Sequence, residues 1–396
     1  MHTSPLAQPG SGDSGGMNVY VRELVAALAQ AGVRTEVYVR RGADDLPEVV
    51  DVEPGFRVVH VDAGPVDLAK EHLPEVVDAY TEAVAAHLSR RDGPDAIHAN
   101  YWLSGLAGHR LKHELSLPLV STFHTLARVK AETGDPEPDR RVEAETEVIG
   151  CSDAILANCE AEVAQLVELY GARPDRIEIV PPGVDHAFFS PGDRAGARAA
   201  LGLGAHPVLL FVGRIQPLKG VGVAIEALAE LSRTHPDAVL VVVGGPSGAD
   251  GDAELADAEA LVDRCGLAEQ VRFVDPQPHH LLSTYYRAAD VCLVPSRSES
   301  FGLVALEAAA CGTPVVAAAV GGLLNLVDDG VTGVLVDTRV PADYAAATRE
   351  ILDEPSRAAA MAAAAAERAR RYTWSTSAAR LRRLYADLTA REPVRC

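Results

Sequence analysis

Two patterns of hydrophobic positions alternate along the chain. Short apolar runs predict strands buried on both faces, and longer stretches with apolar residues at every third or fourth position predict covering helices. In the first half we expect strands at 35–40, 58–63, 96–100, 118–124 and 154–158, and helices around 17–30, 74–90, 105–115 and 160–170.

A second series of the same kind follows the Pro/Gly-rich segment VPPGVDHAFFSPGD (180–193). Its expected strands are 208–213, 238–245, 271–275, 291–296, 314–319 and 333–337. The Ala-rich run 357–371 and the stretch 375–390 predict two further helices. This alternation predicts an α/β protein of two Rossmann-like lobes with parallel sheets that face a cleft. The expected lobes are residues 1–185 and 186–373, with a last helix in 374–396 that packs back on the N-terminal lobe.

Length and charge narrow the class of protein. A chain of 396 residues favours two domains over one. The formal net charge of −20 argues against binding to nucleic acid or to an anionic membrane surface. We find no apolar run of membrane-spanning length and no secretory signal at the N-terminus, so we expect a cytoplasmic protein.

The six cysteines have no CxxC spacing, and most lie in apolar surroundings. Buried free thiols are therefore expected rather than disulfides or a metal site. The cysteines are Cys151, Cys159, Cys265, Cys292, Cys311 and Cys396.

The stretch GSGDSGGMN (10–18) matches the glycine pattern of dinucleotide-binding loops. That pattern should follow a strand, but only nine residues precede it, and two of them are proline. It also needs an acidic residue at the end of the second strand, where this chain has Arg40 and Arg41. A dinucleotide cofactor is therefore disfavoured. An anion-binding loop and an ordinary glycine cap on a helix both remain.

Charged residues follow two of the expected strands in the second half. In VGRIQPLKG, Arg214 and Lys219 could hold a pyrophosphate, although one Arg and one Lys in a loop are more often simply solvated. In SRSESFGLVALEAAACGTPVV, seven residues separate Glu299 from Glu307. Carboxylates at a strand end suit sugar and ribose hydroxyls, whereas the spacing alone also occurs by chance.

Together these motifs resemble the retaining GT-B glycosyltransferases of family 4. The segments HTSPLAQPGSGDSGGMNVYV, NYWLSG, HTLARVK and GGPSG extend the likeness to the D-inositol-3-phosphate glycosyltransferases of mycothiol biosynthesis, over nearly the whole chain. The resemblance implies a GT-B fold and retaining transfer of N-acetylglucosamine from UDP-GlcNAc to 1D-myo-inositol 3-phosphate. The alternatives are a family 4 enzyme with another phosphorylated or natural-product acceptor, a nucleotide-sugar-binding protein without turnover, and an NAD-dependent oxidoreductase.

The resemblance also assigns roles at the donor. Arg214 and Lys219 would neutralise the departing diphosphate, Glu307 would bind the ribose hydroxyls, and Glu299 the sugar hydroxyls. His124 would support the donor sugar and, with Arg214, Lys219 and Glu299, completes the catalytic set, although a buried histidine of the core is an equal alternative. The implied donor set is Gln8, Pro9, Gly16, Arg214, Lys219, Gln277, Glu299 and Glu307.

For the acceptor, the resemblance implies one group around the phosphate and one around the inositol ring. The phosphate group is Lys70, Tyr101, Thr125 and Arg141, and the ring group is His2, Asp13, Ser14, Gly15, Gly16, Met17 and Asn18. Each phosphate residue also has an ordinary structural reading, such as surface charge, packing or a helix position. The chemistry requires no metal, but the family can carry Mg²⁺ near YRAAD, at Tyr286, Arg287, Ala289 and Thr313. The expected partners are the donor and acceptor alone, and a homodimer is compatible with the sequence.

The fold that the resemblance implies has a central first strand before the glycine loop. Here the likeness begins at His2, where that strand should already be ending. We therefore expect an unfilled strand position in the N-terminal lobe, which about five to ten further residues upstream would supply.

Overall fold

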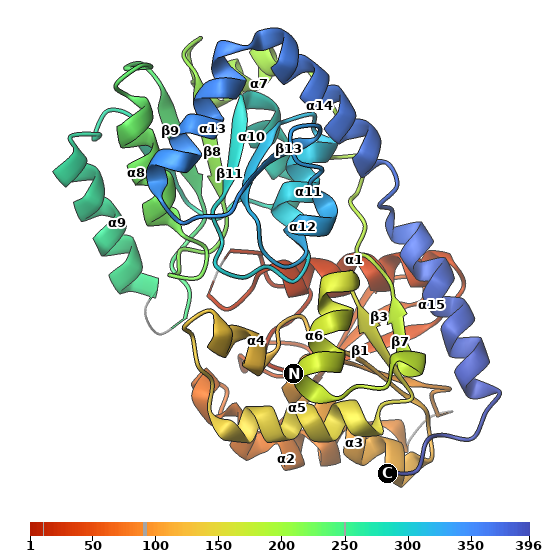
Figure 1. Ribbon diagram of the computed structural model, residues 1–396. Coiled ribbons are helices and arrows are strands. Elements are labelled where there is room, and N and C mark those ends of the chain that lie inside the picture. Colours follow the sequence, from red (N-terminus) through yellow and green to blue (C-terminus); the bar gives the residue numbers. More distant parts are fainter. Residues whose placement is uncertain (11, 90–92, 249–250) are drawn as a thin grey trace. The chain divides into compact units, whose positions relative to one another are not determined.

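The computed structural model describes residues 1–10, 12–89, 93–248 and 251–396. Ser11 of the glycine loop and Arg90 at the end of an expected helix lie outside these ranges. The chain forms two compact units, and the colours of Figure 1 follow the sequence from red at the N-terminus to blue at the C-terminus. The first unit comprises Met1–Leu6, Met17–Gly183 and Trp374–Cys396, and the second comprises Ala7–Gly16 and Val184–Thr373.

The strands of the first unit form two separate sheets. One has the order β1-β3-β2, in which β3 pairs parallel with β1 and antiparallel with β2. The other has the order β4-β5-β6-β7 and is parallel throughout. The strands are β1 (Thr35–Arg40), β2 (Val49–Glu53), β3 (Phe56–Val61), β4 (Ile97–Asn100), β5 (Leu119–Thr122), β6 (Ala154–Ala157) and β7 (Ile177–Ile179).

Among the described residues, β1 and β4 are edge strands of these different sheets. The amide of Arg40, at the end of β1, donates to the carbonyl oxygen of Met1 at 3.4 Å. The Met1 ammonium donates to Ser104 Oγ at 3.2 Å. The unfilled position for a central strand before the glycine loop stays a prediction.

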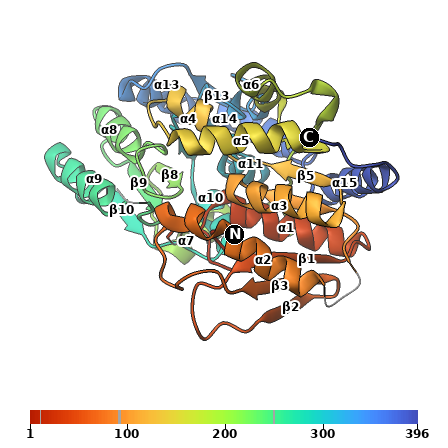
Figure 2. The ribbon, with the colours of Figure 1, turned by 90° about the horizontal axis from the view of Figure 1, so that it is seen from below.

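Helices cover both faces of the parallel sheet in the first unit. Neighbouring residues of β6 point to opposite faces, as the pleat of a strand requires. Leu156 packs with Leu24 and Leu381 of helices α1 and α15, whereas Ile155 packs with Val148 and Leu166 of α5 and α6. Figure 2 shows α2 and α3 near the smaller sheet. The helices are α1 (Gly16–Gln30), η1 (Lys70–Val76), α2 (Val77–Leu88), α3 (Trp102–Leu115), α4 (Ala127–Glu132), α5 (Asp139–Cys151), α6 (Glu160–Tyr170), η2 (Pro174–Arg176) and α15 (Trp374–Thr389).

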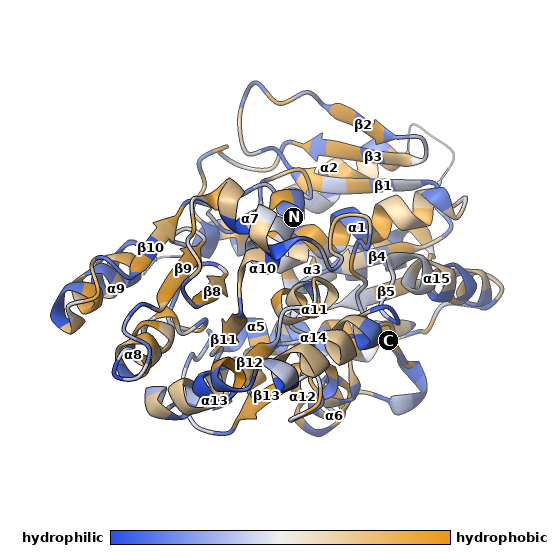
Figure 3. Ribbon diagram, turned by 90° about the horizontal axis from the view of Figure 1, so that it is seen from above, coloured by the Kyte–Doolittle hydropathy of each residue, from blue (hydrophilic) through white to orange (hydrophobic). Residues whose placement is uncertain are grey.

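The second unit contains one sheet of six parallel strands, in the order β10-β9-β8-β11-β12-β13. Leu209 and Leu210 of β8 enter different core clusters, one under α8, α9 and α13 and the other under α10 and α11. The strands are strongly hydrophobic in Figure 3, whereas α9 also carries hydrophilic residues. The strands are β8 (Val208–Val212), β9 (Val239–Val243), β10 (Val271–Val274), β11 (Val291–Val294), β12 (Val315–Ala318) and β13 (Gly333–Val336).

The helices of the second unit connect these strands and close the unit after β13. They are α7 (Arg194–Leu201), α8 (Val221–Leu231), α9 (Gly251–Cys265), η3 (His279–Leu281), α10 (Leu282–Ala288), α11 (Leu303–Ala310), α12 (Leu323–Leu326), α13 (Pro341–Asp353) and α14 (Pro355–Ala369). In the described ranges, no helix combines the length and the apolar character that crossing a membrane requires.

The cysteines partly contradict the expectation of free thiols. Cys151 at the end of α5 and Cys396 form a disulfide within the first unit. The prediction was wrong for this pair because the two residues are 245 positions apart, a separation at which spacing carries no information. Cys159, Cys265, Cys292 and Cys311 are free thiols.

Candidate functional site

Lys219 and Glu299 meet where strands β8 and β11 of the second unit end. Lys219 Nζ lies 2.6 Å from Glu299 Oε2, and both side chains stay partly exposed, at 23% and 18%. Gly220, with φ of +75°, makes this approach possible, because a Cβ there would lie 2.5 Å from the carbonyl oxygen of Pro295. The amide of Arg297 also donates to the carbonyl oxygen of Leu218 at 2.8 Å, so the two loops are joined through their backbones.

Arg214 lies in the same loop as Lys219, closer to the end of β8. It follows β8, and its guanidinium donates to the hydroxyl of Ser247, after β9, at 3.3 Å. Sequence reasoning missed Ser247, the serine of GGPSG, because this segment was used only as evidence for the resemblance and was given no role of its own. The result is two cations, one carboxylate and one hydroxyl at the carboxyl edge of a parallel sheet, where such sheets bind ligands.

The glycine loop, residues 7–16, belongs to this same unit. A Cβ at Gly15 would lie 2.9 Å from Arg214 Nε, so a glycine is needed there for the loop to pack on the guanidinium. Gln8 Nε2 donates to the carbonyl oxygen of Pro276, after β10, at 2.6 Å. Gly10 packs on the same proline, and Gly16 lies near Leu303 at the start of α11. The loop therefore covers strand-end segments of the second unit.

Glu307 lies on α11 and is nearly buried, at 5% exposure. Its Oε1 lies 2.7 Å from His279 Nε2, and its Oε2 accepts a hydrogen bond from Tyr286 Oη at 2.8 Å. Burial and the Glu307 charge raise the pKa of Tyr286 well above its ordinary value, so the phenol keeps the proton that it donates. Both carboxylate oxygens thus have partners that the sequence did not reveal. Gln277, in the same segment as His279, donates to the carbonyl oxygen of Asp275 at 2.9 Å.

The loop after β12 supports Glu299. The amide of Gly322 donates to the carbonyl oxygen of Glu299 at 2.8 Å. A Cβ at Gly321 would lie 2.1 Å from that oxygen, and a Cβ at Gly322 would lie 2.3 Å from Phe301 Cα. The two glycines of AAAVGG are therefore required for this close approach of backbones.

The first unit gathers another group at the ends of β4 and β5. Tyr101 and His124 follow these adjacent strands, and both have positive φ, of 77° and 62°. Such backbone strain in residues other than glycine concentrates at functional sites. Arg141 reaches the group from α5, with its guanidinium 5.1 Å from the centre of the Tyr101 ring. The same guanidinium donates to the carbonyl oxygen and to Oγ1 of Thr125, both at 3.0 Å.

Three of the four expected phosphate residues therefore lie together, and His2 joins them, with its ring centre 4.6 Å from that of Tyr101. Lys70 is exposed at the start of η1. Its neighbour Glu71 accepts a hydrogen bond from Arg140, next to Arg141, at 3.0 Å. Asn18 donates to Thr3 Oγ1 and to the carbonyl oxygen of Ser4, each at 2.6 Å, and so ties α1 to the N-terminal residues.

The remaining ring-contact candidates divide between the units. Met17 begins the part of α1 that lies in the first unit. Asp13, Ser14, Gly15 and Gly16 lie in the second unit, where the Ser14 carbonyl oxygen accepts from the Gly10 amide at 2.8 Å.

The Arg141 side chain is 2% exposed and forms ion pairs with two carboxylates. Its Nη1 lies 2.8 Å from Glu137 Oε1, and its Nε lies 2.8 Å from Glu145 Oε1. Glu145 is fully buried and also accepts from the Ala127 amide at 2.9 Å and from Tyr170. Lys130 makes a second ion pair with Glu137. The charges around Arg141 are thus balanced within the protein.

His124 is neutral in this environment. Its Nε2 lies 2.9 Å from Asn100 Oδ1, and its ring meets Tyr20 edge-on at 4.8 Å between centres. Burial, with a smaller effect of His98, lowers the pKa of His124 to about 3. The imidazole can therefore give or accept a hydrogen bond, but it does not serve as a charged acid near neutral pH.

The expected Mg²⁺ ligands surround the end of α10. Thr313 Oγ1 donates to the carbonyl oxygen of Tyr286 at 2.6 Å, so two of the four residues already bond each other. Arg287 directs its cation to the carbonyl oxygen of Ser190 at 2.8 Å, and Ala289 contributes backbone alone. A hard divalent cation favours carboxylate ligands, and none of these four residues carries a carboxylate.

Comparisons with known proteins identify the family of the chain. Residues 15–183 match the glycosyl transferase 4-like domain family, and residues 194–368 match the glycosyl transferases group 1 family. A D-inositol 3-phosphate glycosyltransferase 2 from Catenulispora acidiphila is 47% identical over 398 residues, covering 98% of this chain and 93% of that protein. A D-inositol 3-phosphate glycosyltransferase from Geodermatophilus obscurus is 49% identical over 386 residues, covering 94% and 85%.

Among solved structures, a sucrose-phosphate synthase from Thermosynechococcus elongatus superposes with a TM-score of 0.92 at 34% identity, covering 98% of both chains. This likeness confirms the expected GT-B fold with two Rossmann-like lobes. The chain belongs to the D-inositol 3-phosphate glycosyltransferase family.

Proposed function

We propose that this chain transfers N-acetylglucosamine from UDP-GlcNAc to 1D-myo-inositol 3-phosphate with retention at the anomeric carbon, the first step of mycothiol biosynthesis. The observation that carries the proposal is the identity of 47% with a D-inositol 3-phosphate glycosyltransferase over nearly the full length of both chains. The grouping of Tyr101, Thr125 and Arg141 supports a phosphorylated acceptor, because a guanidinium and a hydroxyl both donate to phosphate oxygens.

At the donor, Arg214 and Lys219 offset the negative charge that grows on the leaving diphosphate. This is electrostatic stabilisation by groups that the fold has already positioned. Glu299 holds the Lys219 ammonium at 2.6 Å and offers its remaining acceptor capacity to hydroxyls of the transferred sugar. Glu307 keeps His279 and Tyr286 in place and can accept a ribose hydroxyl through a further lone pair.

At the acceptor, an incoming phosphate competes with Glu137 for Arg141. The guanidinium sits between this carboxylate and Glu145, so a phosphate must share it or displace the more exposed partner. Glu137 is that partner, with its side chain 22% exposed, whereas Glu145 is fully buried. The exposed ammonium of Lys70 would then add the second cation.

For the chemical step we propose a substitution on one face of the sugar. The acceptor hydroxyl passes its proton to an oxygen of the departing diphosphate, and the bond from sugar to diphosphate breaks as the new glycosidic bond forms. Neutral His124 contributes a hydrogen bond to the donor sugar. No covalent intermediate is needed.

The direct test combines the chain with UDP-GlcNAc and inositol 3-phosphate and analyses the product by mass spectrometry and NMR. We expect one N-acetylhexosamine on inositol phosphate, with the anomeric configuration of the donor. A second candidate, transfer to a hexose phosphate, is motivated by the 34% identity to a sucrose-phosphate synthase. A higher kcat/KM with hexose phosphate than with inositol 3-phosphate would replace the proposed acceptor.

A further inference from the structure

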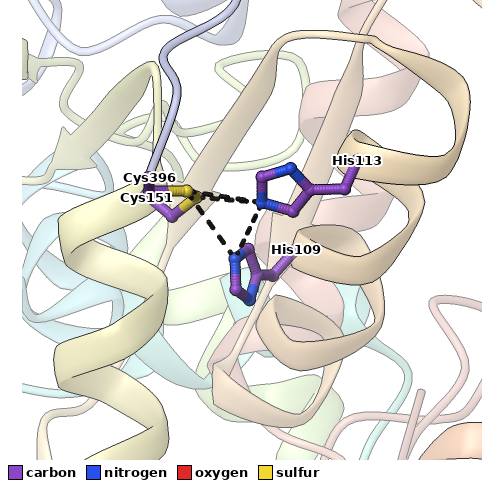
Figure 4. A group of neighbouring side chains, drawn as sticks. All are labelled: His109, His113, Cys151 and Cys396. Carbon is purple, nitrogen blue, oxygen red and sulfur yellow. Dashed lines mark hydrogen bonds between the residues drawn. A yellow bond between two sulfur atoms is a disulfide. The ribbon is translucent and has the colours of Figure 1, made fainter.

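Two histidines and the two disulfide-bonded cysteines gather on the first unit and belong to none of the candidate sites described above. His109 and His113 are one turn apart on α3, Cys151 ends α5, and Cys396 ends the chain (Figure 4). One ligand atom from each of the four lies within 4.8 Å of the others. The proposed transferase function gives this group no role.

Four of the distances among these atoms are close to the edges of a tetrahedron around a metal ion. Zn²⁺ binds imidazole nitrogen at about 2.0–2.1 Å and thiolate sulfur at about 2.3 Å, so tetrahedral ligands lie about 3.3 Å apart for two nitrogens and about 3.6 Å for nitrogen and sulfur. Here the Nε2 atoms of His109 and His113 are 3.1 Å apart. His113 Nε2 lies 3.4 Å from Cys151 Sγ and 3.3 Å from Cys396 Sγ, and His109 Nε2 lies 3.8 Å from Cys396 Sγ.

The surroundings hold these ligands in the required orientation. His109 Nδ1 lies 3.2 Å from Glu147 Oε1, so Nδ1 can donate its proton to the carboxylate and leave the Nε2 lone pair directed at the cluster. Asp153 anchors both cysteine segments. It accepts from the Val394 amide at 2.6 Å and pairs at 2.7 Å with Lys112, whose ammonium also donates to the carbonyl oxygen of Cys151.

We propose that His109, His113, Cys151 and Cys396 form a structural Zn²⁺ site whenever the disulfide between the cysteines is reduced. A dithiol supplies two electrons and two protons, which convert the disulfide into two thiols while the dithiol itself is oxidised to a disulfide. Zn²⁺ then displaces the two thiol protons to solvent and binds two thiolates and two neutral imidazoles. Four protein ligands complete the coordination, so the ion holds Cys396 to α3 and α5 and has no open position for catalysis.

Separating the sulfurs from bonded to non-bonded distance requires little movement of the fold. Cys396 is exposed and lies outside the helices and strands, whereas Cys151 is buried at the end of α5. Cys396 can therefore shift while α3 and α5 keep their positions. The oxidised and zinc-bound forms are alternative states of the same four side chains.

The test measures the zinc content of the purified full-length chain after reduction, addition of Zn²⁺ and desalting, all without oxygen. We expect about one zinc per chain, as four ligands define one site, and the visible absorption of a tetrahedral thiolate complex when Co²⁺ replaces zinc. Cys396→Ser and His113→Ala should lose both signals. Glu147→Gln should weaken zinc binding about tenfold, because it removes the carboxylate that orients His109.

Matched controls are Cys265→Ser, a free cysteine of the second unit, and His72→Ala, an exposed histidine of the first. Both should bind zinc as the parent does. A reduced parent chain that stays free of zinc would overturn the proposal, as would equal binding by the parent, Cys396→Ser and His113→Ala. Because zinc is measured without substrate, the result is separate from the outcome of the transferase assay.

Discussion

The charged residues around Lys219 in the second unit and those around Arg141 in the first unit are arranged in opposite ways. In the second unit, Lys219 pairs with the Glu299 carboxylate, and the pair is partly open to solvent. In the first unit, Arg141 is almost completely buried and bonded to two carboxylates. Charges of the first kind are available to a ligand and contribute little to stability. Charges of the second kind are part of the core, where removal of one partner is costly. Substitutions in the second unit should therefore change rate, and those in the first should also change stability.

The largest effect is expected for Arg141→Ala. It leaves Glu145 buried without its cation, which should lower the free energy of unfolding by about 3–5 kcal/mol. Trp102 and Trp374, the two tryptophans of the chain, both lie in the first unit, so their fluorescence during urea unfolding reports on this unit alone. The control is Arg140→Ala, a neighbouring exposed arginine. Equal unfolding midpoints for Arg141→Ala and Arg140→Ala would contradict the idea that the charge of Arg141 is part of the core.

Lys219→Ala should have the opposite effect and change the rate rather than the stability. We expect kcat to fall by about 10²–10³-fold, the usual cost of losing one group that stabilises transition-state charge. The tryptophan-monitored midpoint should stay at the parent value, because this side chain belongs to the other unit. Arg264→Ala, an exposed position on α9, serves as the control. A parent-like rate would remove Lys219 from the donor site.

Acid should destabilise the first unit. Burial lowers the pKa of His98 to about 4 and that of His124 to about 3, whereas both imidazoles titrate near 6.5 when unfolded. The unfolded chain therefore binds more protons below that pH. The stability contribution is complete above pH 6.5 and falls by about 1.4 kcal/mol per pH unit for each imidazole as the pH drops. Urea unfolding at pH 7, 6 and 5 tests this, and His124→Asn should flatten the dependence.

Gly15→Ala should disturb the position of the Arg214 guanidinium without removing its charge. The new Cβ would lie 2.9 Å from Arg214 Nε and push the loop or the guanidinium aside. A displacement of this size should lower kcat/KM by about 10- to 100-fold. Gly42→Ala is the matched control, because a Cβ there meets no atom within 4 Å and the backbone is unstrained. If the two variants are equally active, contact between the loop and Arg214 has no catalytic importance.

The smallest effect is expected for Glu137→Gln. The change removes one negative charge from Arg141 and keeps the shape of the side chain. An acceptor phosphate then meets less competition, and the KM for inositol 3-phosphate should fall about two- to fivefold, the scale of a partly exposed ion pair. Asp135→Asn is the control, because Asp135 pairs at 2.9 Å with Lys130 rather than Arg141. A higher KM in Glu137→Gln would mean that Glu137 assists the acceptor.

The sequence predicted the apolar strands well, including those of only four residues, and missed two strands that contain an acidic residue. VLLFV and VLVVV lie in the sheet core as expected, because buried parallel strands are continuous apolar runs. The strands VVDVE and IEI were missed, since one is interrupted by an acid and the other has three residues.

The candidate site shows the same limit. Arg214, Lys219 and Glu299 were found because strand ends attract ligands. The partners of Glu307 were not found, because His279 and Tyr286 meet it only through the fold. Burial of Arg141 was equally invisible, since DRRVEAETE is typical of a solvated helix.

The connectivity of the units has a consequence for protein engineering. The chain passes from one unit to the other after Leu6, Gly16, Gly183 and Thr373, so each unit is assembled from separate segments of the gene. A chimaera that exchanged only residues 184–373 between relatives would pair Arg214 from one parent with Gly15 from the other. To move the donor preference of one relative into another, residues 7–16 should therefore be exchanged together with residues 184–373.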